Sequence, residues 1–243
     1  MHRELRSWYS PSLQKEMPVA VYGHYGFALL LIPTAAADYL EYERFQLIDS
    51  IRPHIESGKV KVFSVDSINN ESWMNKSMDP RHKAIRHQQW NDYIYNEVVP
   101  FIRTMTSHET PIIVSGASFG ALHSANLFFK RPDLIHGFIA MSGVYHLTEY
   151  TDGYFDEDVY FNSPGHYLPN LHDHHVLEQM RSNRPIHILS GSGAYEDPHA
   201  ARGLAGVLYN KGIWYELDIW GSDKTHDWPT WRDMLPHYLE TRF

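Results

Sequence analysis

The sequence of 243 residues contains no cysteine. A disulfide framework, a zinc site built on thiolates and a cysteine nucleophile are therefore excluded together. Long apolar runs are missing as well. No segment approaches the roughly 20 residues that span a membrane, and the first nine residues lack the apolar core of a secretion signal. On these grounds we expect a cytoplasmic protein.

Positive charge is also scarce. Lys and Arg number 21 against 29 Asp and Glu, which gives a net charge of −8, and the basic residues are scattered. Such a chain is poorly suited to neutralise a phosphate backbone, so we do not expect nucleic acid as a partner. The hydrophobic share of 43% is that of ordinary globular proteins, and the length suits a single domain over residues 1–243.

Short, continuous apolar runs alternate with stretches of helical periodicity along most of the chain. A run without polar positions is typical of a strand buried on both faces, and right-handed crossover helices would then cover a parallel sheet on both sides. The sequence therefore predicts an α/β fold, a three-layer sandwich with a mostly parallel central sheet. The expected strands cover residues 27–32, 60–65, 111–114, 138–142, 186–190 and 215–220, after two antiparallel edge segments at 4–9 and 18–24; the expected helices cover 39–56, 79–106, 119–130, 174–182, 198–210 and 228–239.

A polar, aromatic-rich insert at about 145–170 interrupts the alternation. We expect it to run above the strand ends and to shape a substrate pocket. Five aromatic residues are candidates for lining that pocket, although a position in the core or on the surface is favoured because aromatic residues are frequent throughout the chain. These residues are Trp73, Tyr145, Tyr154, Phe155 and Tyr160.

The best candidate nucleophile is Ser118, in the pattern Gly116-x-Ser118-x-Gly120. The pattern directly follows an expected strand and opens an expected helix, which is the strand-turn-helix setting of the nucleophile elbow in α/β-hydrolases. The two glycines allow the close approach that a strained turn requires. At the start of that helix, the amide of Phe119 is expected to donate to the oxyanion that forms when Ser118 attacks an acyl carbon.

A serine hydroxyl needs a general base, and His226 is the best candidate among 17 histidines. It lies in a polar loop between the last expected strand and the last helix, where the imidazole would project over the strand ends. The other histidines considered lie inside helices, strands or unrelated loops and are interpreted as core or surface residues: His123, His136, His187 and His237. The group His172, His174 and His175 lacks the spacing of a zinc site, and we expect no metal and no cofactor.

The acid that orients the imidazole is expected between Ser118 and His226 in the chain. Glu196 and Asp197 both follow the next-to-last strand. Asp197 precedes Pro198, which is the arrangement of a helix N-cap with proline in the first turn. Glu196 is then free to face His226, so we favour Glu196 and keep Asp197 as the alternative.

With these residues in order, the chain resembles the esterase family that includes S-formylglutathione hydrolases, feruloyl esterases and bacterial mycolyltransferases. The resemblance is carried by the segments 116–121 and 191–198, and by His226-Asp-Trp-Pro-Thr-Trp231. It implies an α/β-hydrolase fold and hydrolysis of a small-molecule ester through an acyl-enzyme on Ser118. It also implies a second oxyanion donor in the loop Pro33-Thr34-Ala35-Ala36, for which we choose the amide of Ala35, with Thr34 next.

Other readings stay open at this point. The same three residues would serve an acyltransferase, and the same fold would serve a binding protein without turnover. A zinc-dependent hydrolase using the group at residues 172–175 is a third alternative. The sequence leaves the acyl and alcohol specificity open, together with the oligomeric state, which includes a homo-oligomer.

Overall fold

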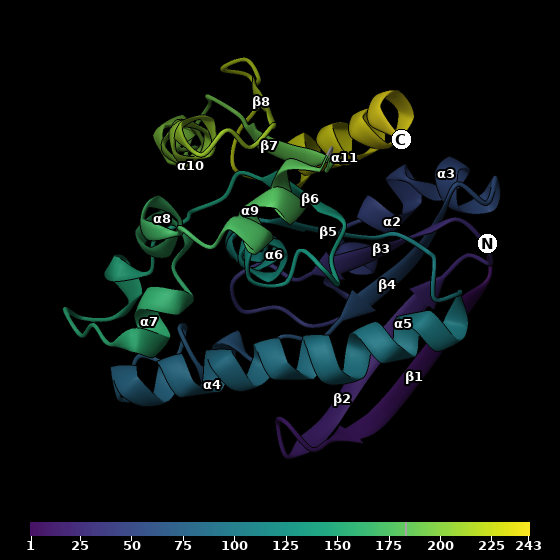
Figure 1. Ribbon diagram of the computed structural model, residues 1–243. Helices are drawn as coiled ribbons and strands as arrows, with labels where there is room; N and C mark the ends of the chain where they lie inside the picture. Colours follow the sequence, from purple (N-terminus) through teal and green to yellow (C-terminus); the bar gives the residue numbers. More distant parts are fainter. Residues whose placement is uncertain (183) are drawn as a thin grey trace.

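The computed structural model describes residues 1–182 and 184–243, and an eight-stranded sheet lies at its centre (Figure 1). The strands follow the order β1-β2-β4-β3-β5-β6-β7-β8. β1 and β2 are antiparallel to each other, β2 is antiparallel to β4, and the remaining pairs are parallel. The strands are β1 Arg3–Ser10, β2 Lys15–Tyr22, β3 Phe27–Ile32, β4 Val60–Val65, β5 Ile112–Ala117, β6 Gly137–Met141, β7 Ile186–Ser190 and β8 Glu216–Ile219.

The apolar runs form the central strands because both faces of the sheet are covered. In β3, Ala28, Leu30 and Ile32 belong to one hydrophobic cluster, whereas Leu29 and Leu31 belong to another. Alternate residues of a strand point to opposite faces, so the two clusters are the two sides of the sheet. The expected three-layer sandwich with a mostly parallel sheet is confirmed.

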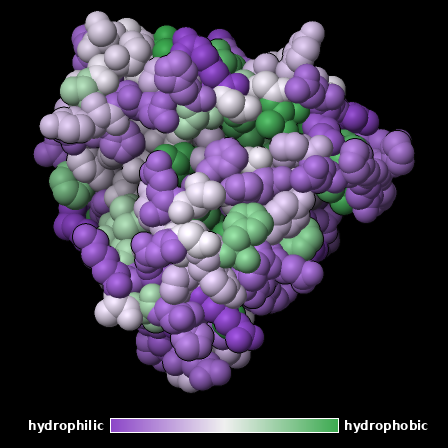
Figure 2. Space-filling model, turned by 90° about the vertical axis from the view of Figure 1, so that its left-hand side faces the viewer, coloured by the Kyte–Doolittle hydropathy of each residue, from purple (hydrophilic) through white to green (hydrophobic). Residues whose placement is uncertain are grey.

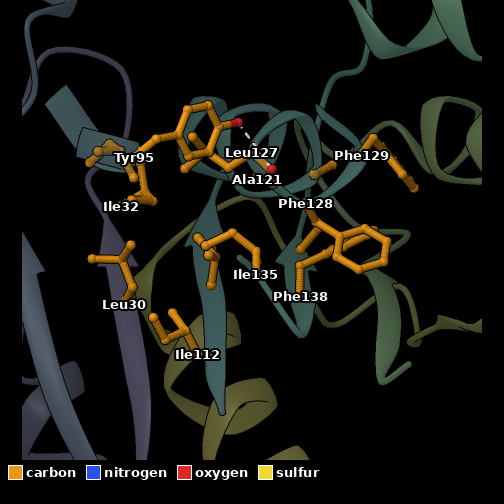
Figure 3. Packing of buried hydrophobic residues seen from close by; sticks show 14 of the residues in the cluster. Leu30, Ile32, Tyr95, Ile112, Ala121, Leu127, Phe128, Phe129, Ile135 and Phe138 are labelled. Atoms are coloured by element: carbon orange, nitrogen blue, oxygen red, sulfur yellow. Dashed lines mark hydrogen bonds between the residues drawn. The ribbon is translucent and has the colours of Figure 1, made fainter. Parts of the chain in front are cut away.

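Two sets of helices make the outer layers. The face of Leu30 and Ile32 is covered by α4, α5, α6, α9 and α10, and the other face by α1, α2, α3 and α11. Figure 3 shows the first face, where Tyr95 lies over the strands and its hydroxyl donates to Leu127 O at 3.0 Å. The helices are α1 Glu41–Arg44, α2 Leu47–Ser50, α3 Arg52–Glu56, α4 Pro80–Tyr93, α5 Val99–Met105, α6 Phe119–Lys130, α9 His174–Arg181, α10 Pro198–Asn210 and α11 Trp228–Arg242.

Two expected helices differ from the structure. The helix expected at 39–56 is three short helices, because Gln46 has a left-handed backbone with φ of 63° that breaks the first from the second. The helix expected at 79–106 starts at the predicted cap, where Asp79 accepts from Arg81 N at 2.9 Å, but it changes to a π-helical segment at Ile94–Val98. The segment precedes Pro100, which has no N–H to donate to the carbonyl four residues earlier.

The insert after β6 forms short helical pieces. They are α7 Glu157–Phe161, α8 Pro164–Tyr167, and 3₁₀ turns at Thr148–Tyr150 and Leu168–Asn170. In Figure 1 these pieces lie to one side of α6, below α10. The insert therefore stands beside the helix that follows Ser118, as a segment that shapes a pocket requires.

Candidate active site

Ser118 lies between the end of β5 and the start of α6, with φ of 56° and ψ of −121°. This strained backbone is held by close contacts on both sides. A Cβ on Gly116 would lie 2.5 Å from the carbonyl carbon and oxygen of Gly120, and one on Gly120 would lie 2.4 Å from Ile32 O. The two glycines therefore let the turn pack against its own helix and against the end of β3.

His226 meets Ser118 directly. Its Nε2 lies 3.0 Å from Ser118 Oγ, in hydrogen-bonding distance. The loop between β8 and α11 is tied down by the His226 amide, which donates to Ala194 O at 3.0 Å. The Trp231 ring meets the imidazole edge-on, with the two ring centroids 5.3 Å apart. The structure thus brings the predicted nucleophile and the predicted base together.

Glu196 stands on the far side of the imidazole. Its Oε2 lies 3.6 Å from His226 Nδ1, and its side chain is fully buried. Burial alone would raise the pKa of Glu196, but the neighbouring His226 and hydrogen bonds from Ser142 and Ser190 outweigh it and hold the pKa below its ordinary value. Asp197 instead caps α10 by accepting from His199 N at 3.0 Å. Of the two candidate acids, Glu196 is the one beside His226.

Two residues near Glu196 have roles that the sequence did not predict. Ser142, just after β6 and with φ of 53°, donates from Oγ to Glu196 Oε1 at 2.6 Å. The buried Trp231 donates from its indole Nε1 to Ser142 Oγ at 2.9 Å. Trp231 is the last residue of the His226 to Trp231 pattern, so that pattern contained a signal for its role. A chain of hydrogen bonds thus reaches the carboxylate from α11.

The loop after β3 is held next to the nucleophile. The buried hydroxyl of Tyr42 donates to Ile32 O at 2.7 Å and accepts from Ala117 N at 3.1 Å, so it bridges the ends of β3 and β5. Glu41 accepts from Thr34 N at 2.9 Å and from Thr34 Oγ1 at 2.5 Å. Burial raises the pKa of Glu41 despite these bonds. Neither Glu41 nor Tyr42 was singled out by the sequence.

Ala35, the predicted second oxyanion donor, follows Thr34 directly. Its side chain packs against the small cluster that contains Trp73 and Phe119. The predicted donors Phe119 and Ala35 therefore belong to one packed unit beside Ser118.

Three of the histidines interpreted as core or surface residues have positions or partners of that kind. His187 is buried and meets Glu216 at 3.1 Å, His136 Nδ1 accepts from Ile112 N at 3.2 Å, and His123 is buried within α6. In the part of the chain that the structure describes, no group of three or more His, Cys, Asp or Glu is arranged to hold a metal ion.

A cavity of about 320 Å³ lies between the insert and α10. Tyr145, Tyr150 and His146 line it from the insert, and Asp197 and His199 line it from the start of α10. The surrounding face is largely hydrophilic, with scattered hydrophobic residues (Figure 2). Of the five aromatic candidates, Tyr145 is the one in this lining, and Trp73, Tyr154, Phe155 and Tyr160 lie outside it.

Over residues 1–182 and 184–243, no helix combines the length and the apolar character needed to cross a membrane.

Solved structures resemble the whole chain. A ferulic acid esterase matches with a TM-score of 0.77 and 16% identity over 98% of this chain and 96% of its own. An S-formylglutathione hydrolase from Staphylococcus aureus matches with a TM-score of 0.72 and 14% identity, over 99% of this chain and 98% of its own. FphF, a fluorophosphonate-binding serine hydrolase of the same organism, matches with a TM-score of 0.74 and 13% identity, over 98% of this chain and 97% of its own. No curated protein sequence matches the chain.

These observations define an α/β-hydrolase-fold enzyme that acts on carboxylic esters. The chain belongs to the esterase family described as "Putative esterase", whose model matches residues 52–241. The resemblance noted in the sequence is thereby confirmed.

Proposed function

We propose that the protein hydrolyses a small-molecule ester through an acyl-enzyme on Ser118, with His226 as general base and acid and Glu196 as the residue that orients it. The observation that carries the proposal is the 3.0 Å contact between His226 Nε2 and Ser118 Oγ, with the buried Glu196 carboxylate behind the imidazole. A nucleophile, a base and an orienting acid in one line are the geometry of this chemistry.

The reaction runs in two halves. His226 Nε2 takes the hydroxyl proton as Ser118 Oγ bonds to the ester carbonyl carbon, and the carbonyl oxygen becomes an oxyanion near the amides of Phe119 and Ala35. The bond to the alcohol then breaks, and His226 returns the proton to the leaving oxygen. Water repeats the sequence on the acyl-serine, which releases the carboxylic acid and restores Ser118.

The cavity beside α10 is the proposed pocket for part of the ester. Its volume of about 320 Å³ suits a small organic group. One of its walls, Tyr150, packs on Phe119 with ring centroids 4.9 Å apart, and another, Asp197, follows Glu196 in the chain. These connections support a pocket that adjoins the reacting atoms.

The test is hydrolysis of p-nitrophenyl acetate by the purified protein and by Ser118→Ala and His226→Ala. Each substitution should lower kcat by about 10⁴-fold or more, because each removes a partner of the proton transfer. A fluorophosphonate probe should label the natural chain at Ser118 and fail to label Ser118→Ala. An unreactive Ser118 in the folded natural chain would instead indicate a binding protein without turnover.

A further inference from the structure

A row of four buried polar side chains, one of them from α6, is not used by the proposed chemistry. Trp73 Nε1 donates to His87 Nδ1 at 2.9 Å, His87 Nε2 lies 3.1 Å from His123 Nδ1, and His123 Nε2 lies 3.0 Å from Asn69 Oδ1. None of the four residues is more than 3% exposed. Asn69 Nδ2 then donates to Thr34 O at 3.4 Å, so the row ends on the loop after β3.

The hydrogen bonds of this row have one consistent direction. The indole of Trp73 only donates, so His87 Nδ1 accepts and the proton of the neutral imidazole lies on Nε2. His87 therefore donates to His123 Nδ1, and His123 donates from Nε2 to the Asn69 carbonyl oxygen. The Asn69 amide nitrogen is left to face Thr34 O. Burial, which lowers the pKa of His123 to about 3, keeps the ring neutral and the direction fixed at ordinary pH.

Thr34, the residue that receives this row, is also held through its own N–H and hydroxyl. Glu41 accepts from the N–H and the hydroxyl of Thr34, while Asn69 donates to the Thr34 carbonyl. In a planar trans peptide the carbonyl of Thr34 and the N–H of Ala35 point in opposite directions. The bond from Asn69 therefore fixes the direction of the Ala35 N–H.

We infer that Trp73, His87, His123 and Asn69 form a positioning relay that orients the Ala35 amide as an oxyanion donor. The inference rests on the proposed function, since it assigns these residues to the same reaction. Four buried polar groups have a desolvation cost that an apolar core of equal volume would not have. The hydrogen bonds offset that cost only while each of the four groups keeps its partners. The relay is therefore rigid, and the position of its last group, the Asn69 amide, is well defined.

The test compares two buried asparagines. Asn69→Leu breaks the relay next to Thr34. Asn126→Leu is the matched control, because Asn126 is also fully buried, donates to Asn162 Oδ1 at 3.0 Å and accepts from Tyr167 at 3.0 Å, and belongs to a separate network. Both variants should lose thermal stability. Only Asn69→Leu should lose activity.

The activity loss should have the signature of a misplaced oxyanion donor. Complete removal of such a donor costs about 10²–10³-fold in kcat, so a misdirected one should cost about 10- to 100-fold, with KM for p-nitrophenyl acetate nearly unchanged. Inhibition by phenylboronic acid, which forms a tetrahedral anion on the serine, should weaken by the same factor. His123→Gln retains one acceptor and one donor and should keep more activity than His123→Leu.

The outcomes distinguish failure of the proposed function from failure of the relay. A natural chain that neither hydrolyses the ester nor reacts with a fluorophosphonate overturns the proposed function. If the natural chain is active and Asn69→Leu changes kcat and boronate inhibition no more than Asn126→Leu does, the relay is only core packing. Should Asn69→Leu fail to fold, Trp73→Phe, which removes the indole N–H at the far end and keeps an aromatic ring, decides between the same two results through the same two measurements.

Discussion

Replacing Glu196 by Gln changes one atom of a buried group and tests the proposed proton path directly. The carboxylate accepts from Ser142 Oγ at 2.6 Å and from Ser190 Oγ at 3.2 Å, and it faces His226 Nδ1 at 3.6 Å. In Glu196→Gln, Ser142, which donates to Oε1 and is the closer of the two serines, holds the amide oxygen on its side, and the amide nitrogen takes the place of Oε2. The amide NH₂ then faces His226 Nδ1 and makes it an acceptor, so the ring proton moves to Nε2.

An imidazole protonated on Nε2 cannot take the proton of Ser118. Loss of the correct tautomer by the corresponding acid-to-amide substitution in a serine protease triad costs about 10⁴-fold in kcat, or about 5 kcal/mol of transition-state stabilisation. We expect a loss of that order here in steady-state hydrolysis of p-nitrophenyl acetate, with the fold intact by circular dichroism.

Asp197→Asn is the control for this substitution. Asparagine serves as an N-cap as well as aspartate does, so α10 should keep its cap. Because Asp197 also lines the proposed pocket, some loss of kcat is expected, but far less than in Glu196→Gln. A full rate in Glu196→Gln together with loss of activity in Asp197→Asn would instead identify Asp197 as the orienting acid.

Two further predictions concern the frame around the site. Gly120→Ala would place a Cβ 2.4 Å from Ile32 O, so it should lower Tm by several degrees and lower kcat. Gly206→Ala is the control, because no atom lies within 4 Å of its new methyl group, and it should change neither quantity. Equal Tm values for the two variants would contradict tight packing at Gly120. Burial lowers the pKa of His136 to about 4, below its value of about 6.5 in an unfolded chain, so this group's contribution to stability is present above pH 6.5 and is lost as the pH falls toward 4. His136→Asn, whose side-chain oxygen can still accept from Ile112 N, should therefore show a smaller drop in Tm between pH 7 and pH 5, and an unchanged drop would contradict the assignment.

The strands and helices nearest Ser118 were predictable because their signals are local. The apolar run before residue 118 and the helical periodicity after it are read within a few residues, and α6 and α10 match their expected bounds. The cap at Asp197 follows from the proline beside it. By contrast, the break between helices at Gln46 depends on a left-handed backbone conformation, which a glutamine in the sequence does not predict.

The contacts of the supporting residues were not predictable because the partners are distant in the chain. Tyr42 reaches Ala117 across 75 residues, and Trp231 reaches Ser142 across 89. The sequence allows His123 to be interpreted as a core residue. Which of its ring nitrogens donates, however, depends on Trp73 and His87, which lie in other segments of the chain. Such roles follow from the topology of the sheet and not from local pattern.

The geometry of the site then traces back to one strand pairing. In the parallel pair of β3 and β5, Ile32 lies opposite Gly116, two residues before Ser118. The loop after Ile32 therefore begins beside the turn that carries the nucleophile, and both the Tyr42 bridge and the Gly120 contact depend on that register. A slip by one residue would turn the side chains of β3 to the opposite face and separate both contacts. The two hydrophobic clusters that enclose β3 thus fix the register, and through it the position of the proposed oxyanion donors relative to Ser118.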